Sequence, residues 1–395
     1  MDLYILDVNF TPVELVENYE TLVWTERFFE PGEFELTTVS TPENSSQLRI
    51  GTYLGVNTSP RIMVIETVED LVGAEGIRQI KATGRSIELI FEKRVARHHM
   101  LMLDEDEVWK FTQKLPGQIM RTLVYDICMT GVLSPDDIIP QMVKREGNST
   151  GLFYDKSHLM PEPHIPIDME IGVKSLSKAL AQVNNKYPLG YRLYRDITAK
   201  TNNLYFDVYT GTNRTLMQNE VTPIIFSLPW GSLKSTSDLD TIADYFNTAY
   251  VFSKYGHTTV SRGNPTGLLR NVMDVVVSGD QVDKMVGSSL TQYLKQKGEE
   301  ALEEHKREAL FEGEIAEDYP YIYNKDYFLG DHVDLIGENN VGAVMSIIEN
   351  ITTIDQEGVR SFPTLQMEEH IDPDTWSGLR GGEVWSTMPG FWSDY

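Results

Sequence analysis

Short runs in which apolar and polar residues alternate dominate the first 95 residues of the chain. Alternation with a period of two places the apolar side chains on one face of a β-strand. Turn-forming pairs such as Pro31-Gly32 and Ser59-Pro60 separate the runs. The pattern predicts strands at Leu3–Val8, Thr21–Trp24, Phe34–Val39, Tyr53–Val56, Met63–Val68 and Ile77–Ala82. We therefore expect a small β-barrel or sandwich over residues 1–95.

The clearest local pattern is the segment Trp24-Thr-Glu-Arg-Phe-Phe-Glu-Pro-Gly-Glu-Phe-Glu-Leu36. It predicts a hairpin whose Phe34 and Leu36 point into a core. Pro31 and Gly32 suit the two central positions of a type II turn, in which Gly32 would take a positive φ. The Phe28-Phe29 pair breaks the alternation and predicts a bulge near the turn.

Helical periodicity appears in the next segment, residues 96–190. Pro116 can begin a helix whose apolar residues share one face, and Gly131 follows its end. A second helix is predicted over Val173–Val183. Between the two helices, residues 145–167 are rich in Gly and Pro and predict a flexible loop.

Three further segments complete the predicted organisation. Residues 191–280 read as β-rich and begin with a hairpin that turns at Thr201-Asn-Asn203. Residues 281–366 combine a long helix from Gln281 to Leu310, capped by Asp280, with a C-terminal β unit. Residues 367–395 show no periodicity and carry Trp376, Trp385 and Trp392. This last segment is either a poorly ordered tail or an arm that docks on a neighbouring protein through its aromatic residues.

Composition and charge narrow the classes of function. The formal net charge of −25 argues against tight nucleic-acid binding, which needs clustered Lys and Arg. It is compatible with ordinary solubility and with a surface past which DNA slides. The apolar runs are too short to span a membrane, and the N-terminus does not resemble a secretory signal. The single cysteine, Cys128, predicts an inert buried thiol.

The sequence shows no specific catalytic, metal or cofactor motif. It lacks HExxH, GxxxxGK[ST] and GxSxG patterns. His158 and His164 lie in a Pro-rich loop that does not fix ligand geometry, and the acidic cluster Asp104–Glu107 lacks the spacing of a calcium loop. Carboxylates are too plentiful for a glycosidase pair to be recognised or excluded. We therefore predict no enzyme activity, no catalytic or cofactor-binding residue, no metal site and no cofactor.

Several blocks, taken in order, give the chain a resemblance to the siphophage baseplate hub or tail-associated (Tal-like) tail tip protein family. The first block is the opening hairpin, which is followed by Ile80-Lys-Ala-Thr-Gly-Arg-Ser86. The middle of the chain carries Phe206-Asp-Val-Tyr-Thr-Gly-Thr-Asn-Arg-Thr215 and the stretch from Phe226 to Val251. The block Tyr323-Asn-Lys-Asp-Tyr-Phe-Leu-Gly-Asp331 and the last hairpin complete the match, which covers about residues 1–365.

The resemblance implies an α+β, β-rich fold with tail-tube-like domains and intervening α/β domains. It implies a homotrimeric hub that closes the distal end of a phage tail tube and presents a pseudo-sixfold ring to it. The implied partners are the distal tail protein ring, the tape-measure protein and tip or fibre proteins, with DNA passing through the lumen. The expected location is the virion, after synthesis in the bacterial host cytoplasm, with no integral membrane association. The alternatives are a receptor-binding or a cell-wall-degrading tail tip protein.

Overall fold

The computed structural model describes residues 1–72, 76–97, 108–143, 166–185, 187–195, 203–278, 282, 285, 287–306, 308–316, 321–336 and 342–367. Contacts between residues divide this chain into two compact units. The first combines Met1–Asp238 with Phe311–Gln366, and the second holds Leu239–Leu310. The finer division into five segments stays a prediction.

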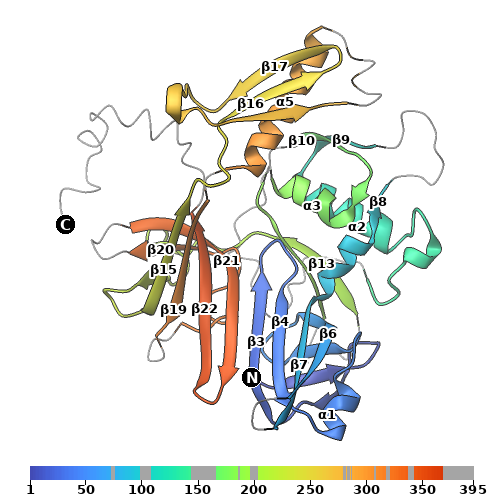
Figure 1. The fold of residues 1–395 in the computed structure, drawn as a ribbon, viewed down its shortest axis with the longest axis vertical. Coiled ribbons are helices and arrows are strands. Elements are labelled where there is room, and N and C mark those ends of the chain that lie inside the picture. The colour runs from blue at the N-terminus through green and yellow to red at the C-terminus, as the bar shows by residue number, and fades with distance from the viewer. Residues whose placement is uncertain are drawn as a thin grey trace. The chain divides into compact units, whose positions relative to one another are not determined.

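One large sheet of 13 strands runs through the first unit (Figure 1). Its main path is β15 (Leu233–Thr241), β19 (Glu308–Ile315), β22 (Gly358–Met367), β21 (Gly342–Asp355), β3 (Tyr19–Arg27), β4 (Glu33–Val39), β7 (Arg78–Ser86), β6 (Ile62–Val72), β5 (Tyr53–Val56), β1 (Leu3–Leu6) and β2 (Pro12–Leu15). A branch adds β20 (His332–Ile336) beside β21, and β14 (Ile225–Ser227) beside β20. Among the described strands this path is open at both ends, so the predicted barrel does not close.

The N-terminal strands follow the predicted alternation. Leu22, Trp24, Phe34 and Leu36 lie in one apolar cluster, together with side chains from β1, β5, β6 and β7. Trp24 is directly opposite Phe34 in the antiparallel pair β3–β4. The sequence pattern missed both β2 and α1 (Pro42–Gln47). In α1 the Thr41 side chain accepts a hydrogen bond from the Asn44 N–H, and Pro42 is the first helical residue.

Two predictions about the opening hairpin are wrong. Gly32 does not have a positive φ, so the turn is not type II. Glycine is needed there because a Cβ would lie 2.2 Å from the Thr25 carbonyl oxygen. The bulge in the β3–β4 pair is between Tyr19 and Thr21, at the far end from the turn. Phe28 directly follows β3, and its N–H donates to the Ile348 carbonyl of β21.

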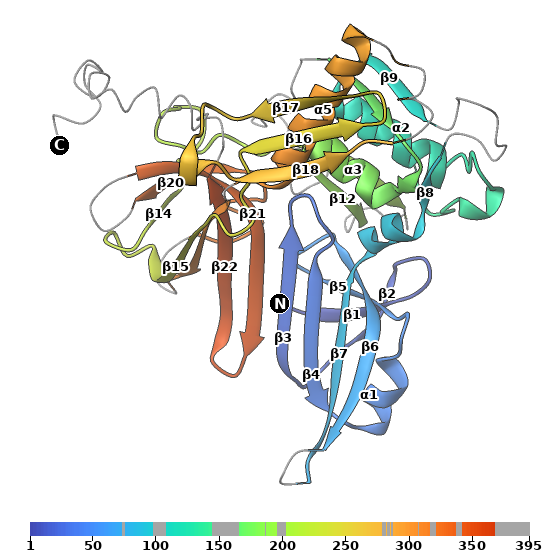
Figure 2. The ribbon, with the colours of Figure 1, turned by 45° about the horizontal axis from the view of Figure 1, so that its top comes forward.

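The C-terminal strands lie beside the N-terminal ones in the same sheet. Strands β21 and β3 are antiparallel neighbours, with Glu349 opposite Arg27 and Ile354 opposite Leu22. Figure 2 shows β21 next to β3 and continuous with β4, β7 and β6. The strands at Asp331–Ile336, Gly342–Glu349 and Gly358–Leu365 were predicted, and the structure confirms them with longer bounds for β21 and β22. The pairing of β21 with β3 was not predicted.

A helical layer with three small sheets completes the first unit. Its main helix α2 (Pro116–Cys128) buries Ile119, Met120, Leu123, Val124 and Ile127, as predicted. Gly131 follows this helix with φ at 61°. The other helix, α3 (Leu176–Asn184), packs against α2 and lies within the predicted region, apart from its last residue. The remaining elements are η1 (Ile87–Lys93), η2 (Pro135–Asp137), and the pairs β8 (Val95–Ala96) with β11 (Lys174–Ser175), β9 (Trp109–Lys114) with β10 (Ile167–Ile171), and β12 (Gly190–Arg195) with β13 (Leu204–Tyr209).

The second unit is a three-stranded sheet with one long helix on one face. The sheet has the order β17 (Gly256–Ser261), β16 (Thr248–Ser253), β18 (Val272–Val276), and η4 (Gly267–Leu269) precedes β18. Leu290, Leu294 and Leu302 of α5 (Ser288–Glu304) share a core with Ala249 and Val251 of β16. This helix was predicted from Gln281 to Leu310 and is shorter at both ends. It begins after Gly287, which has φ at 63°, and residues 308–315 form β19.

The predicted β-rich α+β class is confirmed, with several separate sheets and four apolar clusters among the described residues.

Candidate functional site

The residues predicted to contact other proteins, Trp376, Trp385 and Trp392, lie outside the described residues, and their role stays a prediction. The loop at 145–167 also falls almost wholly outside them, with His158 and His164, and so does the acidic cluster 104–107. Cys128 is buried, and burial raises the pKa of its thiol to about 12, so it is protonated at neutral pH. Sequence reasoning had described this thiol correctly.

Within the described ranges, no group of three or more His, Cys, Asp or Glu side chains could hold a metal ion. No helix in that part of the chain is long and apolar enough to cross a membrane. The polar groups that stand out are instead two buried clusters and one charged sheet face, all in the first unit.

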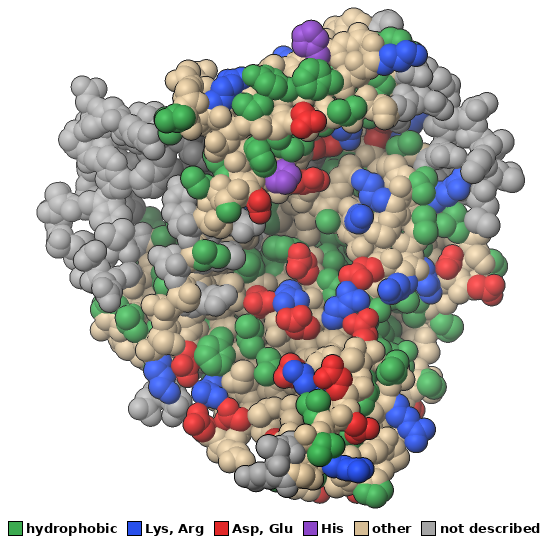
Figure 3. Space-filling view, viewed as in Figure 1, with side chains coloured by type: hydrophobic (Ala, Val, Ile, Leu, Met, Phe, Trp, Pro, Cys, Tyr) green, Lys and Arg blue, Asp and Glu red, His purple; other side chains and the backbone are tan. Residues whose placement is uncertain are grey.

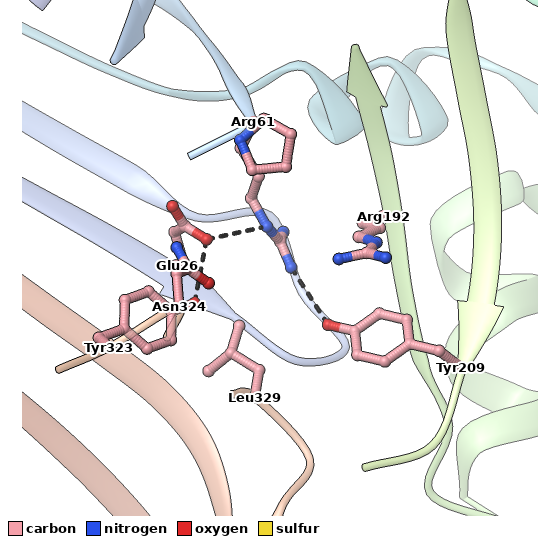
Figure 4. Close-up of a pocket in the computed structure, with 8 residues that line it drawn as sticks. Glu26, Arg61, Arg192, Tyr209, Tyr323, Asn324 and Leu329 are labelled. Carbon is pink, nitrogen blue, oxygen red and sulfur yellow. Dashed lines mark hydrogen bonds and ion pairs between the residues drawn. The ribbon is translucent and has the colours of Figure 1, made fainter. Parts of the chain in front are cut away.

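The first cluster surrounds Arg61, whose side chain is only 2% exposed. Its guanidinium lies 3.4 Å from Glu26 of β3 and 3.3 Å from Glu88 of η1. It also donates to the Arg27 carbonyl at 2.8 Å and to the Tyr209 hydroxyl at 3.4 Å. Figure 4 shows Arg61 pointing between Glu26 and Tyr209. One side chain therefore joins four segments that are far apart in the sequence.

Both carboxylates around Arg61 have further partners. Glu26 accepts hydrogen bonds from the indole N–H of Trp24 at 3.0 Å and from the hydroxyl of Tyr323 at 3.0 Å. Glu88 accepts the backbone N–H of Leu193 at 2.8 Å, while its second oxygen has no hydrogen-bond partner among the described residues. We call Arg61, Glu26, Glu88, Tyr209 and Tyr323 the arginine junction. It links the N-terminal strands, the helical layer and the C-terminal β unit.

Electrostatics keep Arg61 charged. Burial by itself lowers the pKa of Arg61, but the neighbouring Glu88, Tyr209 and Glu26 more than reverse this and raise it. Burial also raises the pKa of the Tyr209 hydroxyl, which therefore stays protonated. The hollow beside these groups has room for about one water molecule. The arrangement can hold elements together, and it offers no space for a substrate.

The second cluster joins two of the sequence blocks that carry the family resemblance. Asp331 is fully buried and accepts hydrogen bonds from Arg214 Nε at 2.7 Å and from the backbone N–H groups of Thr212 and Phe328 at 2.8 and 3.0 Å. Burial raises the pKa of Asp331 to about 6, whereas Arg214 and the N–H of Thr212 act to lower it. A Cβ on Gly211 would lie 1.8 Å from the Gly330 carbonyl oxygen, so the two backbones touch here.

The opening hairpin also contacts the region around Gly211 and Gly330. Phe28 packs edge-on against Tyr209 at 5.3 Å between ring centres, and its ring leaves no room for a Cβ on Gly190 or Gly330. The blocks recognised separately in the sequence are therefore neighbours in space. Sequence reasoning located the blocks by their resemblance to the family, and it missed the contacts between them because those contacts join residues far apart in the chain.

A third polar feature is the face of the large sheet that points away from the Trp24 core. Arg27 pairs with Glu33 at 2.8 Å and with Glu349 at 2.5 Å, and Lys81 pairs with Glu35 at 2.9 Å. Arg85 pairs with both Glu66 and Glu92. Figure 3 shows acidic and basic side chains together in a band across the middle of the view. We call these eight residues the ion-paired face; it crosses β21, β3, β4, β7 and β6 and includes Glu92 of η1.

Every basic residue of the ion-paired face is therefore held by at least one carboxylate. Five carboxylates accompany three basic side chains, so the face carries a small negative excess. Such a surface has no unpaired cation among these residues to bind a phosphate backbone.

Comparison with solved structures places the fold. A tail protein from Neisseria meningitidis MC58 is 14% identical, with a TM-score of 0.53 over 94% of this chain and 97% of that one. The 43 kDa tail protein of prophage MuSo2 from Shewanella oneidensis is 12% identical, with a TM-score of 0.50 over 95% and 99% of the two chains. At these identities the likeness shows a shared fold. The comparison with curated proteins gave no match.

The family itself is shown by sequence. The model of the Siphovirus ReqiPepy6 Gp37-like protein family matches residues 2–365, which is nearly the same range as the predicted resemblance. The predicted relationship to siphophage tail proteins is thereby confirmed. The chain belongs to the Siphovirus ReqiPepy6 Gp37-like protein family, a siphovirus tail protein family.

Proposed function

We propose that this chain is a structural baseplate hub, which closes the distal end of a siphophage tail tube and connects it to tip or fibre proteins. The observation that carries the proposal is the pairing of β21 with β3. Through it, the N-terminal and C-terminal β regions form one sheet, so a single protomer supplies two adjacent wall segments. Three such protomers would supply six segments, as a sixfold tube requires.

The two clusters in the first unit support this role. The arginine junction ties the N-terminal strands to the C-terminal β unit and to the segments between them. The Asp331 cluster ties the C-terminal β unit to residues 212–214. Buried, hydrogen-bonded charges of this kind fix one arrangement, because breaking them leaves an unpaired charge in the interior. A wall that transmits force between a tube and its tip needs such fixed joints.

The remaining parts of the proposal follow from the same assembly. The ion-paired face lines the lumen, where its small negative excess lets DNA pass without binding. The distal tail protein ring and the tape-measure protein contact the hub from the tube side. Segment 367–395, with Trp376, Trp385 and Trp392, acts as an interface arm. The protein is a virion component and acts without catalysis.

The mass of the purified protein in solution tests the proposal. Three chains of 45.0 kDa give about 135 kDa, and light scattering after size exclusion should report this value. Images of the particle should show a ring with a central hole. A stable 45.0 kDa monomer at high concentration would contradict the hub. Binding to host cells or clearing of a cell-wall gel by the purified chain would favour the alternative tip functions.

A further inference from the structure

The three-stranded sheet of the second unit has one face that no described helix covers. Residues of β16 alternate, so that Ala249 and Val251 point to α5 while Tyr250 and Phe252 are exposed at 39% and 44%. Across the strands, Phe252 is opposite His257 of β17 and Val276 of β18. Figure 3 shows hydrophobic side chains gathered at the top of the view, in the region of β16 and β17. Exposed apolar groups concentrated in this way mark an interaction surface.

Cations accompany the aromatic rings of this face. The Arg270 guanidinium lies 5.7 Å from the centre of the Tyr250 ring, and Lys254 lies 5.1 Å from that of Tyr255 in the β16–β17 turn. Asp274, opposite Tyr250, is the acidic residue on the exposed face of β18. Arg270 and Lys254 together outnumber Asp274, so these residues carry a small positive excess in a chain whose net charge is −25. Aromatic rings with cations fit a partner that is acidic and aromatic.

The chain itself contains a segment with that chemistry. Residues 368–395 follow directly after β22 and lie outside the described residues. They carry six acidic residues against one arginine, together with Trp376, Trp385, Phe391 and Trp392. Tryptophan is among the residues most enriched at the energetic centres of protein interfaces. Fully extended, 28 residues span up to roughly 90 Å, which is ample to cross a sheet face.

We propose that the Tyr250–Phe252 face of the second unit binds the acidic, tryptophan-bearing segment 368–395. The indole rings pack on Tyr250, Phe252 and Val276, while the carboxylates approach Arg270 and Lys254. The inference builds on the arm proposed above, for which it names the receiving surface: the Tyr250–Phe252 face of the same chain or of a neighbouring copy. It does not require a trimer. A monomeric mass would therefore contradict the hub alone, and absent peptide binding would contradict this inference alone.

The test measures binding of a labelled peptide of residues 368–395 by fluorescence anisotropy. The receptor is the full-length chain with Trp376→Ser, Trp385→Ser and Trp392→Ser, so that its own segment competes less. The peptide should bind this variant more tightly than it binds the wild-type chain, in which the face is already occupied. Equal binding to both proteins would contradict the proposal.

Changes on the face identify the surface. Tyr250→Ser with Phe252→Ser in the same receptor should weaken peptide binding at least about tenfold. The matched control is Trp230→Ser, an aromatic residue of the first unit that is 52% exposed, and it should leave binding unchanged. Arg270→Gln should reduce both the affinity and its dependence on salt. Thermal unfolding establishes that each receptor is folded.

Other occupants are distinguished with two further probes, a single-stranded oligothymidine and a chitin oligosaccharide. If either binds through Tyr250 and Phe252 while the peptide does not, the face serves nucleic acid or sugar and the proposal is wrong. An equal loss of peptide binding in the Trp230→Ser control would also overturn it, because the peptide would then bind apolar surface without selectivity.

Discussion

A buried charge is costly unless its partners surround it, and Arg61 shows how a single residue acquires them. Three other segments supply the groups that approach its guanidinium: Glu26 and the Arg27 carbonyl from β3, Glu88 from η1, and the Tyr209 hydroxyl from β13. Planar, forked donors allow an arginine to serve several acceptors at once, which a lysine cannot do in the same geometry. The residue therefore fixes the relative positions of these segments more than it adds to net stability.

We expect Arg61→Met to lower the free energy of unfolding by about 3–5 kcal/mol, because Glu26 and Glu88 would remain buried without their cation. Urea unfolding followed by circular dichroism gives this quantity. The control is Lys81→Met, which removes the half-exposed pair with Glu35 and should cost at most about 1 kcal/mol. If the two variants lost similar stability, Arg61 would not hold the segments of the arginine junction together.

At the scale of elements, the opening hairpin shows what the sequence could and could not predict. Its strands and its buried face were predictable, since the alternation of Trp24, Phe34 and Leu36 with polar residues is local information. The conformation of the turn was not predictable. Gly32 is needed because a side chain there would collide with the Thr25 carbonyl on β3, and not because of its own φ. Contacts between strands determine which residue such a position requires, and the local sequence pattern carries no information about those contacts.

The turn gives a sharp test with a matched glycine. Gly32→Ala should destabilise the chain by about 2–3 kcal/mol, since a Cβ 2.2 Å from the Thr25 oxygen forces the strands apart. Gly172→Ala should be neutral or slightly stabilising, because the structure places no atom within 4 Å of its Cβ position and its φ is ordinary. Chemical denaturation compares the two. Equal effects would show that the close approach is absent in solution.

The same limit applies to longer-range features of the chain. Helix α2 was predicted well, since its apolar stripe is continuous. The predicted bounds of helix α5 were too long at both ends. The helix begins only after Gly287, and the charged run after Gly298 has a helical pattern that continues past the true end at Glu304. The arginine junction could not be predicted at all. Arg61 follows a Ser-Pro turn signal, and nothing near it in sequence indicates that Glu88 and Tyr209 meet there.

For the whole molecule, the central consequence of the fold is a sheet with two different faces. One face is buried around Trp24, and the other presents the ion-paired face across five strands. Antiparallel sheets commonly leave one face to water. In the proposed hub this polar face lines the lumen, so the assembled ring should shield it from large molecules.

Cysteine labelling of the assembled protein tests that placement. Thr37 and Thr83 point to the same side as Lys81 and Arg85, and Cys128 is buried with a raised pKa, so it adds little background. In a trimer, Thr37→Cys or Thr83→Cys should react quickly with a small maleimide and at least tenfold more slowly with a maleimide that carries a large polyethylene glycol chain.

Glu43→Cys, on the exposed surface of α1, serves as the control and should react with both reagents at similar rates. Equal modification of Thr37→Cys and Glu43→Cys by the large reagent in a verified trimer would place the ion-paired face outside the ring, because an enclosed lumen must exclude the larger molecule before it excludes the smaller.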